Sequence, residues 1–168
     1  KDGKISSCYA TGSVTGWVSG GFGVGGLVGD NEGSISNCYS TGQVSSSHGY
    51  VGGLVGYSYY GSISNCYSTG TASGSQYVGG LVGGTGWGSI SNCYSTGLVS
   101  GSSNVGGLVG YKTDGSVNNS FWDTDTSGQM TSAGGTGKTT SEMKTLSTFI
   151  SAGWDFTSIW VLPMGQYP

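Results

Sequence analysis

Four cysteines are the residues of this 168-residue chain best suited to chemistry, because four thiolates can hold a zinc ion or an iron–sulfur cluster. They recur at intervals of 30, 28 and 27 residues, as Cys8, Cys38, Cys66 and Cys93. None belongs to a Cys-x-x-Cys pair, and positions that recur once per repeat lie in a line that cannot converge on one ion. A disulfide between neighbours would be strained, because in-register strands hold Cβ atoms about 4.8 Å apart, beyond the roughly 3.5 to 4.5 Å of a bridge. We therefore predict a ladder of free thiols that fill a core.

A second candidate site is the sequence DTDTSG at residues 123–128. Asp123, Asp125 and Ser127 place oxygen ligands at the first, third and fifth positions of a calcium loop, and a glycine follows at the sixth. The twelfth position, where calcium loops carry an acidic residue, is Gly134. Asp and Ser before Gly are also common in turns, so we favour a turn and keep calcium as the one candidate cofactor.

Neither of two further features indicates catalysis. The single histidine, His48, lies between repeated phrases, and none of the repeated positions is acidic, so a positioned base and carboxylates are missing. GGTGKTT at residues 134–140 resembles a phosphate-binding loop, but Ser132 stands where that loop needs its first glycine. We predict a protein that is not an enzyme.

The segment that follows this loop predicts a short helix instead. Thr140 or Ser141 would cap its start, and Gly153 would end it. The apolar residues at helical spacing would form its buried face: Met143, Leu146, Phe149 and Ile150.

The elements that must position all these residues are internal repeats. GxISxCYxTG begins at residues 3, 33, 61 and 88, with a decayed copy from 115, and VGGLVG recurs every 27 residues from 24. The units are rich in β-branched and aromatic residues and broken by glycines, each of which would cost a helix interior about 1 kcal/mol. The pattern predicts an all-β fold, a parallel β-solenoid with coils of about 27 residues. Four coils and a degenerate fifth would span residues 1–122, and a small C-terminal cap that contains the short helix would span 123–168.

Stacked coils predict ladders of equivalent residues. One core ladder would contain leucines: Leu27, Leu54, Leu81 and Leu108. Strict alternation from Ile35 would put Asn37 and Tyr39 on its side of the wall, whereas a corner at Ser36–Asn37 would turn Cys38 inward. We favour the corner, because Asn suits bends and a thiol suits a tight core. The tyrosines of the repeat would then stack along an outer face.

The phrase GLVG, coupled four times in register to CYSTG, resembles the GLUG repeat, which is named for glycine, leucine, an apolar residue and glycine. The resemblance covers about residues 1–122. It implies a bacterial secreted or surface protein, such as an adhesin or the non-catalytic region of an IgA-cleaving metallopeptidase. It implies a scaffold or attachment role and an extracellular or cell-surface location, and it supplies no catalytic residue.

Aromatic residues in the variable loops are candidates for ligand binding, because loops collect binding residues. They are Trp17, Tyr59, Tyr60 and Trp87. A net charge of −3 without a basic cluster argues against nucleic acid, and no apolar run approaches the roughly 20 residues of a membrane span. We expect no membrane insertion, and we expect a cell-surface or extracellular protein or glycan as partner.

The leading hypothesis from the sequence is a non-enzymatic extracellular module, a stiff stalk or binding surface for adhesion. Two alternatives stay open: a self-assembling fibre subunit that associates head to tail, and a carbohydrate-binding module that uses the loop aromatics.

Overall fold

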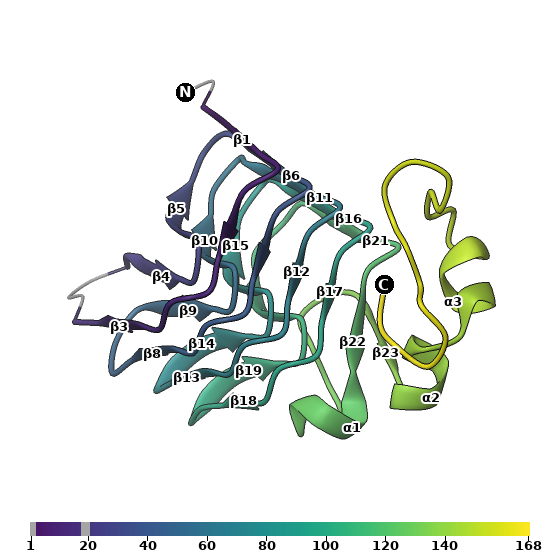
Figure 1. Cartoon of the computed structure of the whole chain (residues 1–168). Coiled ribbons are helices and arrows are strands. Elements are labelled where there is room, and N and C mark those ends of the chain that lie inside the picture. The colour runs from purple at the N-terminus through teal and green to yellow at the C-terminus, as the bar shows by residue number, and fades with distance from the viewer. Residues whose placement is uncertain (1–2, 18–20) are drawn as a thin grey trace.

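Short strands recur five times in each repeat and stack on the equivalent strands of the next repeat to form a parallel β-solenoid (Figure 1). The computed structural model describes residues 3–17 and 21–168. Each of the first four coils supplies one strand to each of five sheets, and every pairing between coils is parallel among the described residues. The predicted all-β solenoid is therefore confirmed.

The five sheets form the walls of the solenoid. The first contains β1 (Lys4–Ser6), β6 (Ser34–Ser36), β11 (Ser62–Ser64), β16 (Ser89–Ser91) and β21 (Ser116–Asn118). The second contains β2 (Tyr9–Ala10), β7 (Tyr39–Ser40), β12 (Tyr67–Ser68), β17 (Tyr94–Ser95), β22 (Phe121–Asp123) and β23 (Thr136–Lys138). The third contains β3 (Val14–Gly16), β8 (Val44–Ser46), β13 (Ala72–Gly74) and β18 (Val99–Ser100).

The remaining two walls come from the VGGLVG phrase. The fourth sheet contains β4 (Gly23–Gly25), β9 (Tyr50–Gly52), β14 (Gln76–Gly79) and β19 (Ser103–Gly106). The fifth contains β5 (Val28–Asn31), β10 (Val55–Ser58), β15 (Val82–Thr85) and β20 (Val109–Lys112). Three short helices follow the last coil: α1 (Thr124–Ser127), α2 (Thr140–Met143) and α3 (Leu146–Ile150). None of the described helices is long and apolar enough to cross a membrane.

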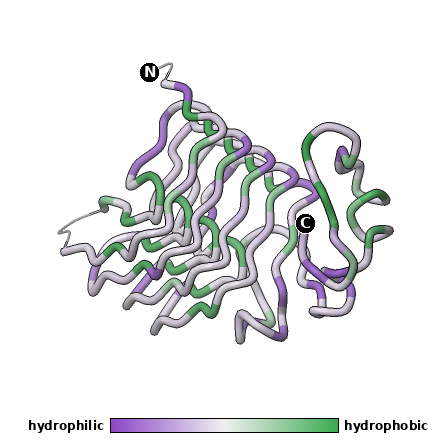
Figure 2. Tube along the Cα trace, in the orientation of Figure 1, coloured by the Kyte–Doolittle hydropathy of each residue, from purple (hydrophilic) through white to green (hydrophobic). Residues whose placement is uncertain are grey.

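Equivalent residues of neighbouring coils lie directly above one another. Ile35 pairs with Ile63, and Val51 pairs with Val78, so the apolar positions form continuous ladders inside the walls. The amide of Leu54 donates to the carbonyl of Leu81 at 2.9 Å, and the amide of Leu81 donates to that of Leu108 at 2.9 Å. Leu54, Leu81 and Leu108 are fully buried, whereas Leu27 of the first coil is partly buried. Figure 2 shows the resulting hydrophobic segments in register from coil to coil.

The two adjacent glycines of VGGLVG let the walls approach more closely than any side chain would allow. A Cβ at Gly52 would overlap the carbonyl oxygen of Val55, and one at Gly53 would overlap Ser68 and the carbonyl of Gly80. The core is accordingly divided into two clusters, one with the leucine and cysteine ladders and one with Val51 and its equivalents. The glycines therefore set the cross-section of every coil.

The corner that the repeat predicted lies at its asparagine. Asn37, Asn65, Asn92 and Asn119 all have φ between 49° and 55°, the left-handed region that Asn tolerates better than most residues. The corner turns the next residue inward, and Cys38, Cys66 and Cys93 are buried.

The C-terminal segment packs against the end of the solenoid and folds back over its second wall (Figure 1). Thr139 caps α2 in a capping box with Glu142. The chain turns between α2 and α3, so the single predicted helix is two helices. Phe149 and Met143 are buried against Tyr94 and Phe121, but the prediction of a buried face was wrong for Leu146 and Ile150, which point to solvent. The break changes the helix direction, and the 3.6-residue spacing no longer applies across it.

We predict that Leu81→Ala lowers the free energy of unfolding by about 2 to 5 kcal/mol, because it leaves a cavity between two fully packed coils. Leu98→Ala is the matched control: Leu98 is 53% exposed, and we expect its effect to stay within about 0.5 kcal/mol. Denaturant unfolding followed by circular dichroism measures both. Equal effects of the two substitutions would contradict the leucine ladder as the core.

Candidate functional site

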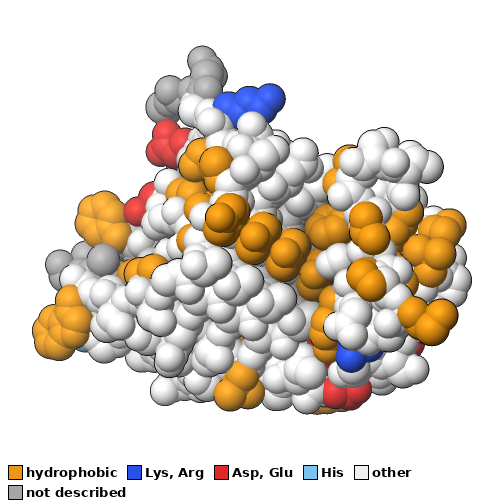
Figure 3. Space-filling model, in the orientation of Figure 1, with side chains coloured by type: hydrophobic (Ala, Val, Ile, Leu, Met, Phe, Trp, Pro, Cys, Tyr) orange, Lys and Arg blue, Asp and Glu red, His pale blue; other side chains and the backbone are white. Residues whose placement is uncertain are grey.

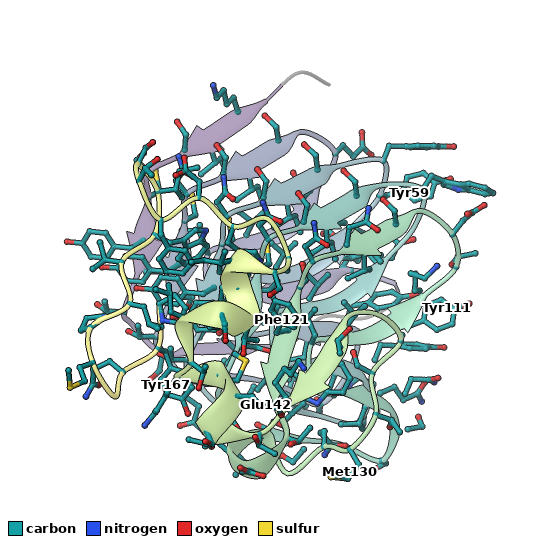
Figure 4. All side chains as sticks on the ribbon, turned by 90° about the vertical axis from the view of Figure 1, so that its right-hand side faces the viewer. Tyr59, Tyr111, Phe121, Met130, Glu142 and Tyr167 are labelled. Atoms are coloured by element: carbon teal, nitrogen blue, oxygen red, sulfur yellow. The ribbon has the colours of Figure 1, made fainter. Side chains whose placement is uncertain are left out.

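Seven aromatic rings gather on the outer side of the VGGLVG walls and on the loops that follow them. We call this group the aromatic surface: Tyr50, Tyr57, Tyr59, Tyr60, Tyr77, Trp87 and Tyr111. The ring centroids of Tyr50 and Tyr57 are 4.5 Å apart, and those of Tyr50 and Tyr77 are 4.6 Å apart. Figure 4 shows Tyr59 and Tyr111 on one side of the coils and Tyr167 of the C-terminal segment on the opposite side.

Strand register positions the inner rings of this surface. Tyr50 immediately precedes the buried Val51, so its side chain points to the opposite, outer side of the wall. Tyr57 lies in register with Asp30 of the preceding coil and Gly84 of the following coil, and Tyr111 is next in that row. A Cβ at Gly84 would overlap the ring of Tyr50, so the missing side chain provides the space in which that ring lies.

The outer rings carry the exposed ring faces. A chain of contacts runs from Tyr57 to Tyr59 (6.1 Å between centroids), then to Tyr60 (4.3 Å) and to Trp87 (6.5 Å). Tyr60 is 62% exposed and Trp87 is 50% exposed, whereas Tyr50 and Tyr57 are partly buried by their neighbours. A tyrosine phenol, with an ordinary pKa of about 10, is already neutral at pH 7, and burial raises the pKa of Tyr50 and Tyr57 further. The surface can therefore offer uncharged aromatic faces and hydroxyl groups to a ligand.

The structure brings together three of the four loop aromatics that the sequence predicted as a site, namely Tyr59, Tyr60 and Trp87. Trp17 is not among these contacts; it projects beside Ser45 and Ser73 on the third wall and is 89% exposed. Sequence reasoning missed Tyr50, Tyr57, Tyr77 and Tyr111, because they lie inside strands and only some coils carry them. The signal that could have found them is a tyrosine immediately before or immediately after a VGGLVG phrase.

A second set of tyrosines forms a regular stack on the second wall: Tyr9, Tyr39, Tyr67 and Tyr94. Their ring planes are within 8° of parallel, with centroids 4.8 to 5.1 Å apart. Figure 3 shows hydrophobic side chains in a row across the coils toward the C-terminal segment. Each inner ring has both faces against its neighbours, and Trp154 and Trp160 cover Tyr94. Tyr67 and Tyr94 of this stack pack against the C-terminal segment, whereas Tyr9 at its other end is 64% exposed.

The cysteines form a column inside the first core cluster. The amide of Cys38 lies 3.4 Å from Sγ of Cys66, whose own thiol lies 3.1 Å from the carbonyl of Ser64. All four thiols are free, and Ser120 takes the next position of the column, where it accepts from the amide of Cys93 at 3.1 Å. A hydrogen bond with Cys93 and burial raise the pKa of Cys66, and burial raises that of Cys38. The prediction of a buried thiol was wrong for Cys8. This cysteine lies on the first coil and is exposed.

The residues proposed for calcium are engaged by protein donors. Asp123 is fully buried and caps α1: its Oδ1 accepts from the amides of Asp125 and Thr126, and its Oδ2 accepts from the hydroxyls of Thr140 and Tyr167 at 2.7 Å each. Ser127 Oγ accepts from the amide of Gln129 at 3.2 Å. The predicted turn is a one-turn helix that ends at Gly128, which has φ of 69°. Within residues 3–17 and 21–168, no group of three or more His, Cys, Asp or Glu residues could hold a metal ion. Asp123 thus links α1, α2 and the C-terminal residues.

Comparison with known proteins places the repeats in a described motif. The GLUG motif matches residues 20–45, 47–73 and 74–100, which correspond to consecutive coils of the solenoid. A 46-residue stretch, 27% of this chain, is 48% identical to a protein of Evansella cellulosilytica that is provisionally named a Gly-rich membrane protein, and it spans 5% of that protein. The crystal structure of a provisionally named immunoglobulin A1 protease from Bacteroides ovatus superimposes with a TM-score of 0.67 at 26% identity. That match covers 89% of this chain and 52% of the protease chain, so this chain spans about half of it.

We predict that a thiol reagent at pH 8 modifies Cys8 quickly and leaves the other three cysteines unmodified until the protein unfolds. Burial excludes the reagent, and the raised pKa of Cys38 and Cys66 lowers the fraction of reactive thiolate. Mass spectrometry of the native and denatured protein counts the labels. Rapid labelling of Cys66 in the native protein would contradict the buried column.

We predict that millimolar calcium leaves the melting temperature unchanged, because the oxygens of Asp123 are already bonded to protein groups. Asp123→Asn should lower the melting temperature with or without calcium, since the buried carboxylate accepts four hydrogen bonds. A calcium-dependent rise that Asp123→Asn abolishes would restore the calcium site.

Proposed function

We infer that this chain, a GLUG-repeat β-solenoid, is a non-enzymatic module of a bacterial surface or secreted protein that presents a ligand-binding surface on a stiff scaffold. The observation that carries the proposal is the aromatic surface. Its rings are held by strand register and by one another, yet Tyr60 and Trp87 keep more than a third of their area exposed. These rings belong to neither core cluster of the solenoid, and exposed aromatic patches are typical of interaction sites.

The scaffold is suited to a spacer or platform role. Each of the first four coils is joined to the next of them by five parallel pairings, and two apolar clusters run along the axis. Binding loops mounted on such a frame lose little conformational freedom when a ligand arrives, which favours affinity.

The names of the similar proteins support a place at the cell surface. One is named as a membrane protein, and the other is named as a protease of an antibody that acts outside cells. Because this chain spans only part of each, we assign it neither the membrane anchor nor the protease activity of those proteins. We propose that it is the repeat portion of a larger surface-attached or secreted protein.

A glycan is the ligand class that the aromatic surface fits best. Neutral aromatic faces pack against the apolar faces of sugar rings, while the hydroxyls of Tyr59 and Tyr60 can exchange hydrogen bonds with the sugar hydroxyls. The stepwise chain of rings from Tyr57 to Trp87 offers an extended surface rather than a closed pocket. Such a surface favours a polysaccharide or oligosaccharide over a small metabolite.

The head-to-tail fibre is the weaker candidate. Segment 129–138 covers the last coil: the amide of Gly107 donates to Thr131, Ser132 Oγ accepts from the amide of Val109 at 2.9 Å, and β23 pairs with β22. Trp122 lies over Gly107 where the earlier coils carry serines. These contacts occupy the strand edge to which another copy would have to add.

We predict that Trp87→Ala and Tyr60→Ala each weaken glycan binding by about tenfold, the effect of removing one central ring from an interface. Glycan arrays identify the ligand, and calorimetry measures the change in Kd. Trp17→Ala is the matched control, because Trp17 is exposed on another wall, and its binding should equal that of the unmodified protein. Loss of binding in Trp17→Ala with full binding in Trp87→Ala would place the site elsewhere.

A further inference from the structure

A pocket of about 300 Å³ adjoins the aromatic surface at the N-terminal end of the solenoid. Three aromatic side chains and two carboxylates line it: Phe22, Tyr57, Tyr59, Asp30 and Glu32. Phe22 is 62% exposed, and Tyr59 is 37% exposed, so both rings keep area free for a ligand. In Figure 3, acidic and hydrophobic side chains lie close together at this end of the molecule.

The fold itself places the carboxylates beside the rings. Asp30 and Tyr57 occupy equivalent positions of β5 and β10, one strand spacing apart. The amide of Tyr59 donates to the carbonyl of Asn31 at 2.9 Å, which holds the loop of Tyr59 against the first coil. The buried side chain of Asn31 donates a hydrogen bond to Ser58 Oγ at 3.0 Å, which holds this part of the pocket lining in place.

The negative charge of the pocket is not balanced within the described part of the chain. Asp30 accepts one hydrogen bond, from the amide of Gly23 at 3.1 Å, and Glu32 is exposed. The ion pair found among residues 3–17 and 21–168 joins Lys138 to Glu142, in the C-terminal segment. No basic side chain lines the pocket. Burial raises the pKa of Asp30, and the hydrogen bond from the amide of Gly23 only partly offsets this effect.

We propose that this pocket binds a cationic group, an ammonium or quaternary ammonium carried by the extracellular ligand. Aromatic faces attract such cations through their quadrupoles, and they tolerate a methylated ammonium that makes few hydrogen bonds. The two carboxylates supply the opposite charge, and the volume suits a single small head group. Asp30 and Glu32 are exposed to solvent in the free protein, and a neutral sugar would bring no positive charge to them. The inference rests on the proposed binding role of the adjoining surface and narrows its ligand to one that carries positive charge.

The test uses choline as the probe and 3,3-dimethylbutan-1-ol as its uncharged isostere, both titrated into the unmodified protein. Chemical shifts of the Tyr and Phe ring protons report binding. We expect saturable binding of choline and at least about tenfold weaker binding of the isostere, because only choline gains the charge interactions. Equal binding of the two probes, or no saturable binding of choline, would overturn the proposal.

Variants assign the binding to this pocket. Asp30→Asn and Tyr59→Ala should each weaken choline binding by about tenfold or more. Asp114→Asn is the matched control, because Asp114 is also an aspartate that accepts a backbone amide but lies on an exposed loop outside the pocket. Circular dichroism checks that each variant is folded. Unchanged choline binding in a folded Asp30→Asn protein would also overturn the proposal.

The two levels of inference fail separately. Glycan binding that depends on Trp87 but shows no preference for cationic ligands would keep the proposed function and remove the cation site. Choline binding that depends on Asp30, with no glycan bound on any array, would keep the cation site and remove the glycan as ligand.

Discussion

Parallel hydrogen bonding between equivalent residues of successive coils is the constraint on which the rest of this structure depends. This bonding fixes neighbouring coils at one strand spacing. Each inward side chain of one coil must therefore pack directly on the equivalent side chain of the next coil. This requirement explains why the phrase SNCYSTG recurs almost unchanged from coil to coil, and why the phrase VGGLVG does so too. The cysteines meet the same requirement: their small side chains lie at the inner side of each corner and pack on one another in successive coils.

The same constraint leaves the outer side of the walls free to vary. Between repeats the chain carries different loops, and at outward positions it carries Asp30, Tyr57, Gly84 and Tyr111 in a single row. A uniform interior with a varied exterior is how a repeat protein gains a specific surface. Here the varied positions produce the aromatic surface and the acidic pocket beside it, both formed by residues from more than one coil.

The C-terminal segment covers the strand edges of the last coil, on which no further coil stacks. Trp122, Ser132 and β23 cover the last coil, while Phe149, Trp154 and Trp160 pack on the stacked tyrosines. The buried Asp123 joins the two parts: its Oδ1 caps α1, and its Oδ2 accepts from the hydroxyls of Thr140 and Tyr167. This closure protects the last coil against addition of further strands.

The coils, their length and their ladders could be predicted from the sequence alone, because stacking imposes the same residue at the same place and so leaves a periodic signal. The sequence favoured a corner at Ser36–Asn37 over strict alternation, and the backbone of Asn37 established it. The sequence also marked Tyr59, Tyr60 and Trp87 as loop aromatics. Only the tertiary structure showed that Trp17 lies apart, that Tyr50 fills the space above Gly84, and that Asp30 faces Tyr57 and Tyr59. Those contacts join residues of different coils at positions that do not repeat, so no period records them. The break between α2 and α3 could not be predicted either. The C-terminal segment has no repeat, and its conformation depends on how it packs against the second wall.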